Sequence, residues 1–401
     1  MKTATGKPNP DDLADLDSLL SDEEREIRAT VRQVCDDTVE PHIAQWYEDG
    51  DLPAARELAK EFGKVGMLGM HLDGYGCAGL SAVDYGLTCL ELEASDSGIR
   101  SLVSVQGSLA MFAIWRFGSE EQKTEWLPRM ATGEAIGCFG LTEPDAGSDP
   151  GSMRTTARRD GDGENADWIL NGAKMWITNG SIADVAVVWA NAGEQNGGIR
   201  GFVVPTNTPG FSAPKIKHKM SLRASVTSEL VLDGVRLPSD AVLPEVRGLK
   251  GPLSCLSEAR FGIVWGALGA ARACLHAARD YSKTRVQFGK PIAGFQLTQA
   301  KLAAMHGELL NGQLLALHLG RLKDSKGLRP DQVSLGKYNN VTKSIEIART
   351  ARTILGANGI SGEYPVMRHA NNLESVLTYE GTAEMHTLVI GQALTGLAAY
   401  R

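Results

Sequence analysis

The sequence predicts an α+β protein with three consecutive parts: an all-helical domain over residues 1–136, a β domain over 137–246 and a four-helix bundle over 247–401. Three observations predict this order. Capped segments with helical periodicity fill the first part, alternating β-branched, aromatic and polar residues fill the second, and long runs with apolar residues at steps of three and four fill the third. At 401 residues the chain can form more than one hydrophobic core.

The first part begins with a clear helix start. Ser21 precedes the acidic residues of "SDEEREIRATVRQV", as an N-cap followed by negative charge in the first helical turn. "SEEQKTEWL" has the same pattern from Ser119. We therefore expect helices from Ser21 to about Met130.

Strand-like patterns begin near Gly137. In "DWILNGAKMWIT", the dipeptide Asn171-Gly172 separates two strand-like runs and predicts a hairpin turn at that point. "ADVAVVWA", "IRGFVVP" and "SELVLDGVRLP" extend the pattern to about Pro244. A compact β domain is expected.

Helical periodicity returns at about Ser257. Small residues in "GALGAARA" allow close helix approach, and further helices are predicted over residues 296–322, 330–355 and 383–399. A bundle of about four long helices follows from this pattern.

The composition excludes several classes of protein. With 43% hydrophobic and 22% charged residues and a net charge of −7, the chain resembles soluble globular proteins and lacks the basic footprint of a nucleic-acid partner. No run predicts a membrane span and the first twenty residues do not predict a targeting peptide, so a cytoplasmic protein without membrane insertion is expected. Because the six cysteines form no CxxC pair, and no HExxH, P-loop or GxSxG pattern occurs, we predict no metal site.

One glycine motif has two interpretations. "GYGCAG", residues 74–79, matches the dinucleotide-binding pattern GxGxxG. A Rossmann fold would need alternating strands and helices after it, whereas helical segments follow. We therefore predict that these glycines form turns.

Three motifs together resemble the acyl-CoA dehydrogenase family: "CFGLTEPDAGSD" (138–149), "KMWITNG" (174–180) and "LTYEGT" (377–382). That family's order of helical, β and four-helix-bundle domains is similar to the predicted order over nearly the whole chain. The resemblance implies an FAD cofactor, an acyl-CoA substrate, an electron-transfer flavoprotein as electron acceptor and a homotetramer.

The first two motifs would hold the flavin. Taken alone, "TEPDAGSD" is a solvated polar turn or a binding loop, and the tryptophan of "WIT" is an ordinary half-buried strand aromatic. By resemblance, backbone near Phe139 and Leu141 lines the ring, Thr142 and Ser148 bind its pyrimidine and pyrophosphate, and Trp176 and Thr178 flank it. The predicted flavin contacts are Phe139, Leu141, Thr142, Ser148, Trp176, Ile177, Thr178 and Thr382.

A further segment would reach a cofactor in a neighbouring subunit. Without the family, "RVQFGKPIAGFQ" (285–296) is a loop that ends a helix. By resemblance, it contacts the adenosine end of FAD bound to another chain, and "ILGANG" has an alanine where the family commonly has a second glycine. The residues implied are Arg285, Phe288, Gln296, Gly356 and Ala357.

Glu380 has two interpretations. By itself it is a solvated residue before a capped helix. By resemblance it is the catalytic base that removes the proton α to the thioester. Burial would raise its pKa and the adjacent helix N-terminus would oppose that rise, while Gly381 leaves room for the thioester.

The substrate is indicated by "ELEASDSGIRSLVSVQ" (91–106), which resembles the glutaryl-CoA dehydrogenase branch of the family. There, Arg100 and Ser101 would bind the distal carboxylate of the acyl group, a task that suits a guanidinium. The alternative is a structural ion pair of Arg100 with Asp96 or Glu93. The other residues expected at the substrate are Glu93, Ser148, Arg260, Tyr379 and Gly381.

The main functional hypothesis is therefore FAD-dependent dehydrogenation and decarboxylation of glutaryl-CoA to crotonyl-CoA and CO2. Three alternatives stay open. One is a dehydrogenase of another acyl-CoA, short-chain or dicarboxylyl, that does not decarboxylate. The others are an oxidase that passes electrons to O2 and a non-enzymatic module that binds flavin or thioester.

Overall fold

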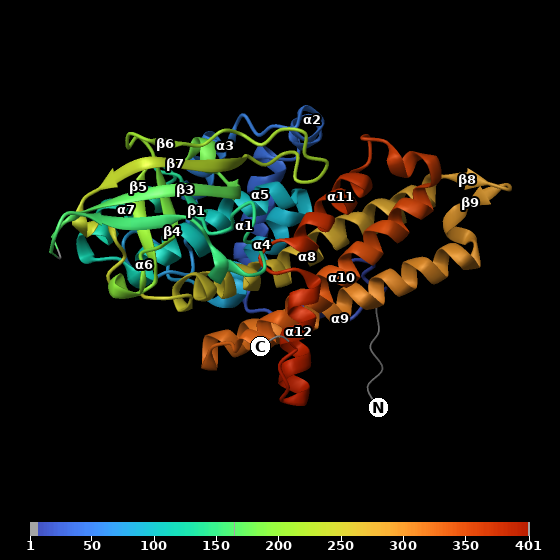
Figure 1. Ribbon diagram of the computed structural model, residues 1–401. Helices are drawn as coiled ribbons and strands as arrows, with labels where there is room; N and C mark the ends of the chain where they lie inside the picture. Colours follow the sequence, from blue (N-terminus) through green and yellow to red (C-terminus); the bar gives the residue numbers. More distant parts are fainter. Residues whose placement is uncertain (1–6, 164, 400–401) are drawn as a thin grey trace.

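The structure is a computed structural model that describes residues 7–163 and 165–399. A helical part, a β-sheet and a bundle of long helices follow one another along the chain (Figure 1). The helical part comprises α1 (Asp22–Thr38), α2 (Ile43–Asp49), α3 (Ala55–Lys64), α4 (Ala82–Ser95), α5 (Ser97–Ser104), α6 (Phe112–Phe117) and α7 (Glu120–Ala131). This order confirms the predicted α+β fold class.

The two predicted helix starts are confirmed. Ser21 Oγ accepts from the Glu24 backbone N–H at 3.1 Å, and the Glu24 carboxylate accepts from the Ser21 N–H at 2.8 Å. Ser119 and Gln122 form the same reciprocal pair at the start of α7. Each pair satisfies backbone donors that a helix start leaves free.

The middle part forms one mixed sheet of seven strands in the order β1-β4-β2-β3-β7-β6, with β5 paired to β4. Strands β1 and β2 run parallel to β4, and the other pairs are antiparallel. The strands are β1 (Gly137–Gly140), β2 (Thr156–Asp160), β3 (Asp167–Thr178), β4 (Val185–Asn191), β5 (Ile199–Pro205), β6 (Phe211–Ser212) and β7 (Thr227–Leu237).

The hairpin predicted at Asn171-Gly172 is wrong, because β3 runs straight through both residues. Asn171 pairs with Thr156 of β2, and its side chain accepts from the Gly234 N–H at 2.8 Å. Gly172 has φ +147° at a register shift against β7 and packs so closely on Thr155 that a Cβ would lie 2.5 Å from its hydroxyl. The dipeptide therefore makes a β-bulge with partners on both sides.

The bundle comprises α8 (Lys250–Thr284), α9 (Gln296–Lys326), α10 (Pro330–Leu355), α11 (Pro365–Thr378) and α12 (Ala383–Thr395), and a small hairpin, β8 (Val286–Gln287) and β9 (Lys290–Pro291), joins α8 to α9. Helix α8 begins seven residues before the predicted Ser257. Pro252 lies in its first turn, where no intrahelical N–H is required. The residues before Ser257 therefore belong to the same helix as Arg260.

The expectation that no run is long enough to span a membrane is corrected by α8. In the described part of the chain, α8 is long and apolar enough to cross a membrane by length and composition alone, and 78% of its most apolar stretch is buried inside the protein. A Cβ at Gly269 would lie 1.9 Å from Leu90 O, so small residues bring α4 and α8 together, as predicted. The apolar character of α8 is accounted for by this central position in the core.

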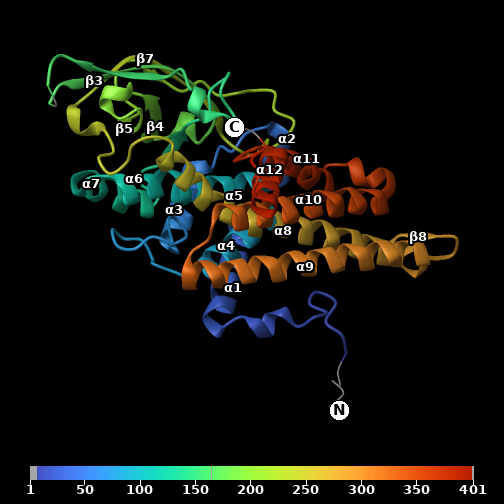
Figure 2. The same cartoon turned by 60° about the horizontal axis from the view of Figure 1, so that its bottom comes forward.

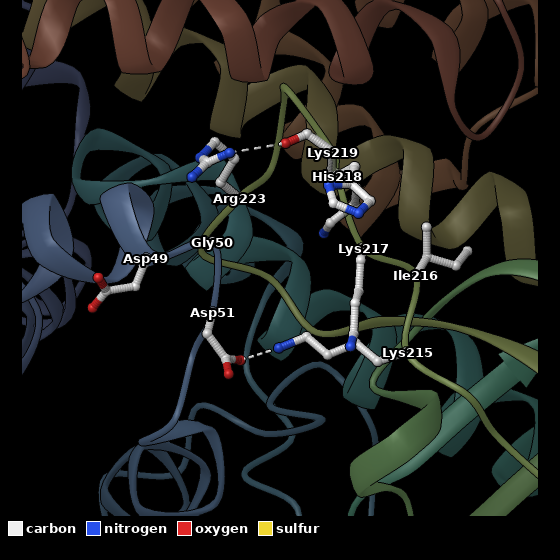
Figure 3. A pocket seen from close by; sticks show the side chains of 9 residues that line it. All are labelled: Asp49, Gly50, Asp51, Lys215, Ile216, Lys217, His218, Lys219 and Arg223. Carbon is white, nitrogen blue, oxygen red and sulfur yellow. Dashed lines mark hydrogen bonds and ion pairs between the residues drawn. The ribbon is translucent and has the colours of Figure 1, made fainter.

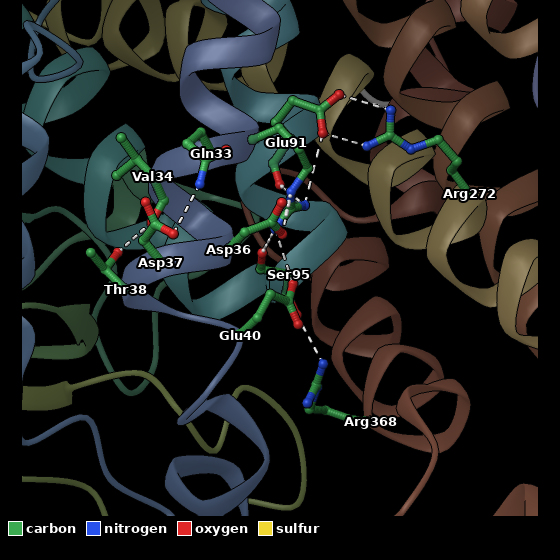
Figure 4. A network of polar contacts seen from close by, with 11 residues as sticks. Gln33, Val34, Asp36, Asp37, Thr38, Glu40, Glu91, Ser95, Arg272 and Arg368 are labelled. Atoms are coloured by element: carbon green, nitrogen blue, oxygen red, sulfur yellow. Dashed lines mark hydrogen bonds and ion pairs between the residues drawn. The ribbon is translucent and has the colours of Figure 1, made fainter.

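Helix α4 is buried along its whole length and connects the helical part to the bundle. Its Glu91 carboxylate accepts from both Nη atoms of Arg272, on α8, at 2.8 and 2.5 Å (Figure 4). At the end of α4, the Ser95 carbonyl accepts from Arg368 of α11 at 3.0 Å. These contacts fix α4, which carries Glu93, against two bundle helices.

The glycines of residues 74–79 form turns, as predicted. Gly74, Gly76 and Gly79 all have φ between +67° and +82° in the loop between α3 and α4. No strand precedes them in the described residues, so the dinucleotide-binding interpretation is excluded here.

Candidate active site

Glu380 lies in a short turn between α11 and α12. Its φ is +53°, and Gly381 follows with φ +95°. Thr382 Oγ caps α12 by accepting from the Met385 N–H at 3.3 Å. Glu380 Oε2 is buried and has no hydrogen-bond partner among the described residues. A strained backbone and an unpartnered buried carboxylate are typical of a functional site. They exclude the interpretation of Glu380 as an ordinary solvated residue.

The electrostatic environment of Glu380 has two opposing parts. Burial raises the pKa of Glu380, and Arg100, Lys337 and Arg260 oppose that rise. The direction agrees with the prediction. Three cations lower the pKa of Glu380, whereas the start of α12 was expected to lower it.

Arg100 lies on α5 with its side chain fully buried. Its Nε donates to Glu93 Oε2 at 2.7 Å, its Nη1 donates to Ser104 Oγ at 2.8 Å, and its Nη2 donates to the Tyr379 hydroxyl. Gly266 of α8 makes space for this cluster, because a Cβ there would lie 2.1 Å from Glu93 Oε2. The ion-pair alternative is therefore present with Glu93.

Asp96, the other partner considered for Arg100, is bonded elsewhere. Its Oδ2 lies 3.3 Å from Arg368 Nε and accepts from Asn372 Nδ2 at 2.8 Å, and its Oδ1 accepts from the Gly98 N–H at 2.7 Å. As the N-cap of α5, Asp96 orients the helix that carries Arg100.

The Arg100 cluster retains capacity to bind an anion. A guanidinium has five N–H donors, and the contacts above use three, which leaves one on each Nη. Ser101 Oγ is buried and unpartnered in the described structure. These donors lie beside Tyr379, the residue before Glu380, so the structure brings together the predicted residues Arg100, Ser101, Glu93, Tyr379 and Glu380.

Two cations hold the turn at Glu380. Arg260 Nε, from α8, donates to the Glu380 carbonyl at 2.6 Å, and Lys337 Nζ, from α10, donates to the carbonyls of Tyr379 and Gly381. Arg260 was predicted as an acyl-CoA contact, and here it contacts the backbone of the base. Lys337 was not predicted.

A sequence signal for Lys337 exists. It lies four residues from both Val333 and Val341, and all three are buried on one face of α10. A lysine within an apolar stripe at helical spacing indicates a buried cation that needs a partner.

A second buried lysine fixes the polar loop that follows β1. Lys174 Nζ donates to Leu141 O at 3.1 Å and to Glu143 Oε1 at 2.7 Å, and burial lowers the pKa of Lys174 to about 8. The Thr142 carbonyl accepts from the Met175 N–H at 2.8 Å. Lys174 and Glu143 fix the loop that carries Thr142, and neither residue was predicted.

The predicted flavin contacts differ in accessibility. Trp176 is 60% exposed and has φ +64° at the second register shift of β3, so its indole lies at the surface. Ser148 is exposed, and Thr142 and Thr178 are half-buried. The side chains of Phe139, Leu141 and Ile177 are core residues, so they present only backbone to a ligand.

The end of β3 is connected to the bundle beside the base. Thr178 pairs with Thr227, whose hydroxyl accepts from Lys219 at 2.8 Å. Further along the loop that carries Lys219, Ser221 Oγ lies 2.6 Å from Ser375 Oγ, in the last turn of α11. This loop joins the flavin side of the predicted site to the helix that ends at the Glu380 turn.

A surface hollow lies over the same loop (Figure 3). Two of its cations are engaged: Lys215 pairs with Asp51, and Arg223 donates to the Lys219 carbonyl at 3.3 Å. It contains none of the predicted site residues. Its lining comprises Asp49, Gly50, Asp51, Lys215, Ile216, Lys217, His218, Lys219 and Arg223.

The residues predicted for the adenosine end are not brought to Trp176 in one chain. The hairpin β8–β9 lies at the far end of the bundle, opposite the sheet, in Figure 1. Phe288, at its tip, is 94% exposed. All five residues predicted to contact the adenosine end are exposed: Arg285, Phe288, Gln296, Gly356 and Ala357.

Comparison with known proteins identifies the class. Three family models match the chain: the acyl-CoA dehydrogenase N-terminal domain over residues 21–134, the middle domain over 138–235 and the C-terminal domain over 247–395. The chain therefore belongs to the acyl-CoA dehydrogenase family, is an enzyme of that family, and the resemblance found in the motifs is confirmed.

Similar proteins point to two branches of the family. A glutaryl-CoA dehydrogenase structure from Mycobacterium smegmatis is 70% identical with a TM-score of 0.95, covering 98% of this chain and 100% of that chain. Another from the same organism, in complex with FADH2, is 64% identical with a TM-score of 0.95 and the same coverage. The human mitochondrial short-chain specific acyl-CoA dehydrogenase is 37% identical over 377 residues, which are 92% of this chain and 90% of that protein.

Proposed function

We propose that this FAD-dependent enzyme converts glutaryl-CoA to crotonyl-CoA and CO2, with electrons passed to an electron-transfer flavoprotein. The observation that carries the proposal is the buried guanidinium of Arg100, which keeps two free N–H donors beside the residue that precedes Glu380. The 70% identity to a glutaryl-CoA dehydrogenase supports the same substrate.

Charge balance also supports a carboxylated acyl group. The buried ionisable groups that face Glu380 are three cations, Arg100, Lys337 and Arg260, and one carboxylate, Glu93. With Glu380 itself ionised, three positive charges oppose two negative charges. The distal carboxylate of glutaryl-CoA would neutralise the remaining charge, whereas a neutral acyl chain would leave it buried and unpaired.

The chain has residues that fit FAD. Trp176 presents an exposed aromatic face at a strained bulge, the half-buried Thr142 lies on a loop fixed by Lys174, and Glu380 Oε2 is left without a partner. Thr142, Ser148, Trp176 and Thr178 would hold the cofactor. When bound, FAD supplies the acceptor for the hydride that leaves the β carbon.

The chain's own residues would carry the proton chemistry. Arg100 and Ser101 bind the distal carboxylate and so fix the acyl chain with its α carbon at Glu380. The Glu380 carboxylate takes the α proton, and its raised pKa makes it a stronger base. In the unsaturated product, the C–C bond to the distal carboxylate breaks, CO2 leaves, and the electron pair enters the conjugated thioester. Protonated Glu380 then returns its proton to that carbanion.

We further propose a cytoplasmic homotetramer with shared cofactor sites. The exposed Phe288, Arg285 and Gln296 at the far end of the bundle support this proposal, because they could contact FAD only in another subunit.

The test is anaerobic mixing of the purified protein with glutaryl-CoA. We expect loss of flavin absorbance, with crotonyl-CoA and CO2 as products by mass spectrometry. Bleaching by butyryl-CoA but not by glutaryl-CoA would overturn the substrate. Hydrogen peroxide release without an added acceptor would identify an oxidase instead.

A second candidate is dehydrogenation of a short neutral acyl-CoA. The 37% identity to the human short-chain enzyme favours it. The buried Arg100–Glu93 pair disfavours it, because a neutral acyl group gives the free guanidinium donors no partner. The relative kcat/KM for glutaryl-CoA and butyryl-CoA distinguishes the two.

A further inference from the structure

Three successive backbone carbonyls at the proposed base are held by two buried cations. Lys337 Nζ donates to Tyr379 O and, at 2.7 Å, to Gly381 O, while Arg260 Nε donates to Glu380 O at 2.6 Å. Lys337 is 1% exposed, and no carboxylate of the described residues lies within ion-pair distance of it. Its hydrogen bonds therefore go to the backbone of the turn.

This turn needs such support. Glu380 has φ +53°, a left-handed conformation that residues with a Cβ rarely adopt, and Gly381 has φ +95°. The Tyr379 N–H still donates to Ser375 O of α11 at 2.9 Å, and Thr382 is the N-cap of α12, but the helical hydrogen bonds of the described residues do not extend to Glu380 and Gly381 between them. The bonds from Lys337 fix the carbonyls on both sides of Glu380.

We propose that Lys337 is a positioning residue for the base: it fixes the turn that carries Glu380 and supplies positive charge that keeps the carboxylate ionised in a site closed from water. The inference rests on the proposed function, in which Glu380 removes the α proton. The inference gives α10 a role in the reaction, although none of the predicted site residues lies on this helix.

The charged groups around the pair act in a consistent direction. Glu380 is faced by Glu93 from α4, Arg100 from α5, Arg260 from α8 and Lys337 from α10. Burial raises the pKa of Glu380, and the three cations lower it. Burial lowers the pKa of Lys337, and Glu380 raises it. Each group therefore stabilises the charged form of the other, and loss of Lys337 would raise the pKa of Glu380 further.

The remaining neighbour does not supply this charge. His386, from α12, lies against Gly381, and its Nδ1 is 3.1 Å from Ser334 Oγ. Burial lowers the pKa of His386 to about 3, so its ring is neutral at the pH of the reaction. Lys337 cannot be replaced in this role by the histidine.

Two substitutions separate the hydrogen bonds from the charge. Lys337→Gln retains a donor for the carbonyls but is neutral, and Lys337→Met removes both. The matched control is Lys343→Met, on the same helix, because Lys343 is partly exposed and pairs with Glu346 and Glu308 at the surface. Lys337→Arg tests rescue, since it retains the charge.

The first readout is the pH dependence of kcat with glutaryl-CoA. Because the base must be ionised, a higher pKa of Glu380 moves the acid limb of the profile to higher pH. We expect a move of about one pH unit in Lys337→Gln and Lys337→Met, with kcat reduced roughly 10-fold below the limb and KM changed little. Lys343→Met should match the parent, and Lys337→Arg should restore the position of the limb.

The second readout isolates proton removal. A glutaryl-CoA analogue with sulfur in place of the β carbon has α protons but no β hydrogen to transfer. In D2O, Glu380 takes an α proton, exchanges it with solvent and returns deuterium, which NMR of the analogue detects. We expect slower exchange in the Lys337 variants, with the same displacement in pH. Exchange is measured on folded enzyme. If Lys337→Met is partly unfolded, the exchange rate of Lys337→Gln tests the proposal instead.

The outcomes are distinct. Slower exchange and lower kcat with an unmoved acid limb in Lys337→Gln would overturn the proposal and leave Lys337 a structural residue. Unchanged rates in both neutral variants would overturn it as well. If Glu380→Gln exchanged the α protons as fast as the parent, the proposed function itself would be wrong.

Discussion

Arg100 and Glu380 are connected through a single side chain, because the Tyr379 hydroxyl accepts from the guanidinium while its backbone precedes the base. The guanidinium carbon lies 5.6 Å from the centre of the Tyr379 ring, so the ring also packs against the cation. In the proposed function, the position that would bind the distal carboxylate is therefore fixed relative to the position that would bind the α carbon. Such a fixed separation selects acyl groups by length as well as by charge.

Glu380→Gln should abolish proton removal while preserving the fold. The amide is of equal size and cannot act as a base, so we expect turnover of glutaryl-CoA to fall by about 10²- to 10⁴-fold. The melting temperature should stay the same or rise, because a buried charge is removed. Stopped-flow bleaching of the flavin gives the rate, and bound flavin per chain is the control. Turnover equal to that of the parent would remove Glu380 from the mechanism.

Arg100→Gln should lose both glutaryl-CoA turnover and stability. The substitution leaves the Glu93 carboxylate buried without its partner, which costs about 3–5 kcal/mol. The double variant Arg100→Gln, Glu93→Gln should recover most of the stability and still fail with glutaryl-CoA, whereas butyryl-CoA should be accepted better than by the parent. Urea unfolding and kcat/KM for both thioesters are the measurements. A double variant with full glutaryl-CoA activity would show that Arg100 is only structural.

Features of the elements that depend on neighbouring residues in the sequence were predicted. Features that depend on residues far along the chain were not. The helix starts at Ser21 and Ser119 depend on residues three positions away, and both are confirmed. The Asn171-Gly172 turn is wrong because pairing with β2 and β7 on either side stabilises a continuous strand.

The motifs of the candidate site indicated Glu380, Arg100 and their neighbours through family resemblance, and the roles of these residues stay predictions. The buried lysines Lys174 and Lys337 were missed because each is stabilised by carbonyls that only the fold brings near. A sequence states that a lysine is present but not which backbone oxygens will surround it.

Lys174→Met should loosen the loop at Thr142 without unfolding the sheet. The variant removes the donor to Leu141 O and leaves the buried Glu143 carboxylate paired only with backbone N–H groups. We expect the free energy of unfolding to fall by about 3–5 kcal/mol and FAD to dissociate more readily. Lys215→Met, which breaks the partly exposed pair with Asp51, should change stability by less than about 1 kcal/mol. Denaturant unfolding and flavin release test both, and equal effects of the two variants would contradict the assignment.

At the scale of the whole molecule, the two groups of predicted FAD contacts lie at opposite ends of one chain. Figure 2 shows the β8 label at the tip of the bundle and the sheet with β3 and β7 on the other side. Exposed Phe288 and the T-shaped contact between Phe288 and Phe295, with centroids 6.3 Å apart, give that tip an apolar surface. An exposed phenylalanine at a distance from the base is better explained by contact with another subunit than by a role in its own site.

Subunit complementation tests this arrangement. Phe288→Asp should lower bound FAD and turnover, and Glu380→Gln should retain FAD but lack the base. If each site takes its base from one chain and its adenosine contact from another, mixed oligomers contain sites with Glu380 from the first variant and Phe288 from the second. Co-expression or refolding of the two inactive variants together should then restore turnover that neither has alone. Light scattering gives the oligomer size, and oligomers of Glu380→Gln alone are the control. If mixed oligomers form, carry FAD and stay inactive, each chain holds its cofactor by itself, and the shared site proposed here is wrong.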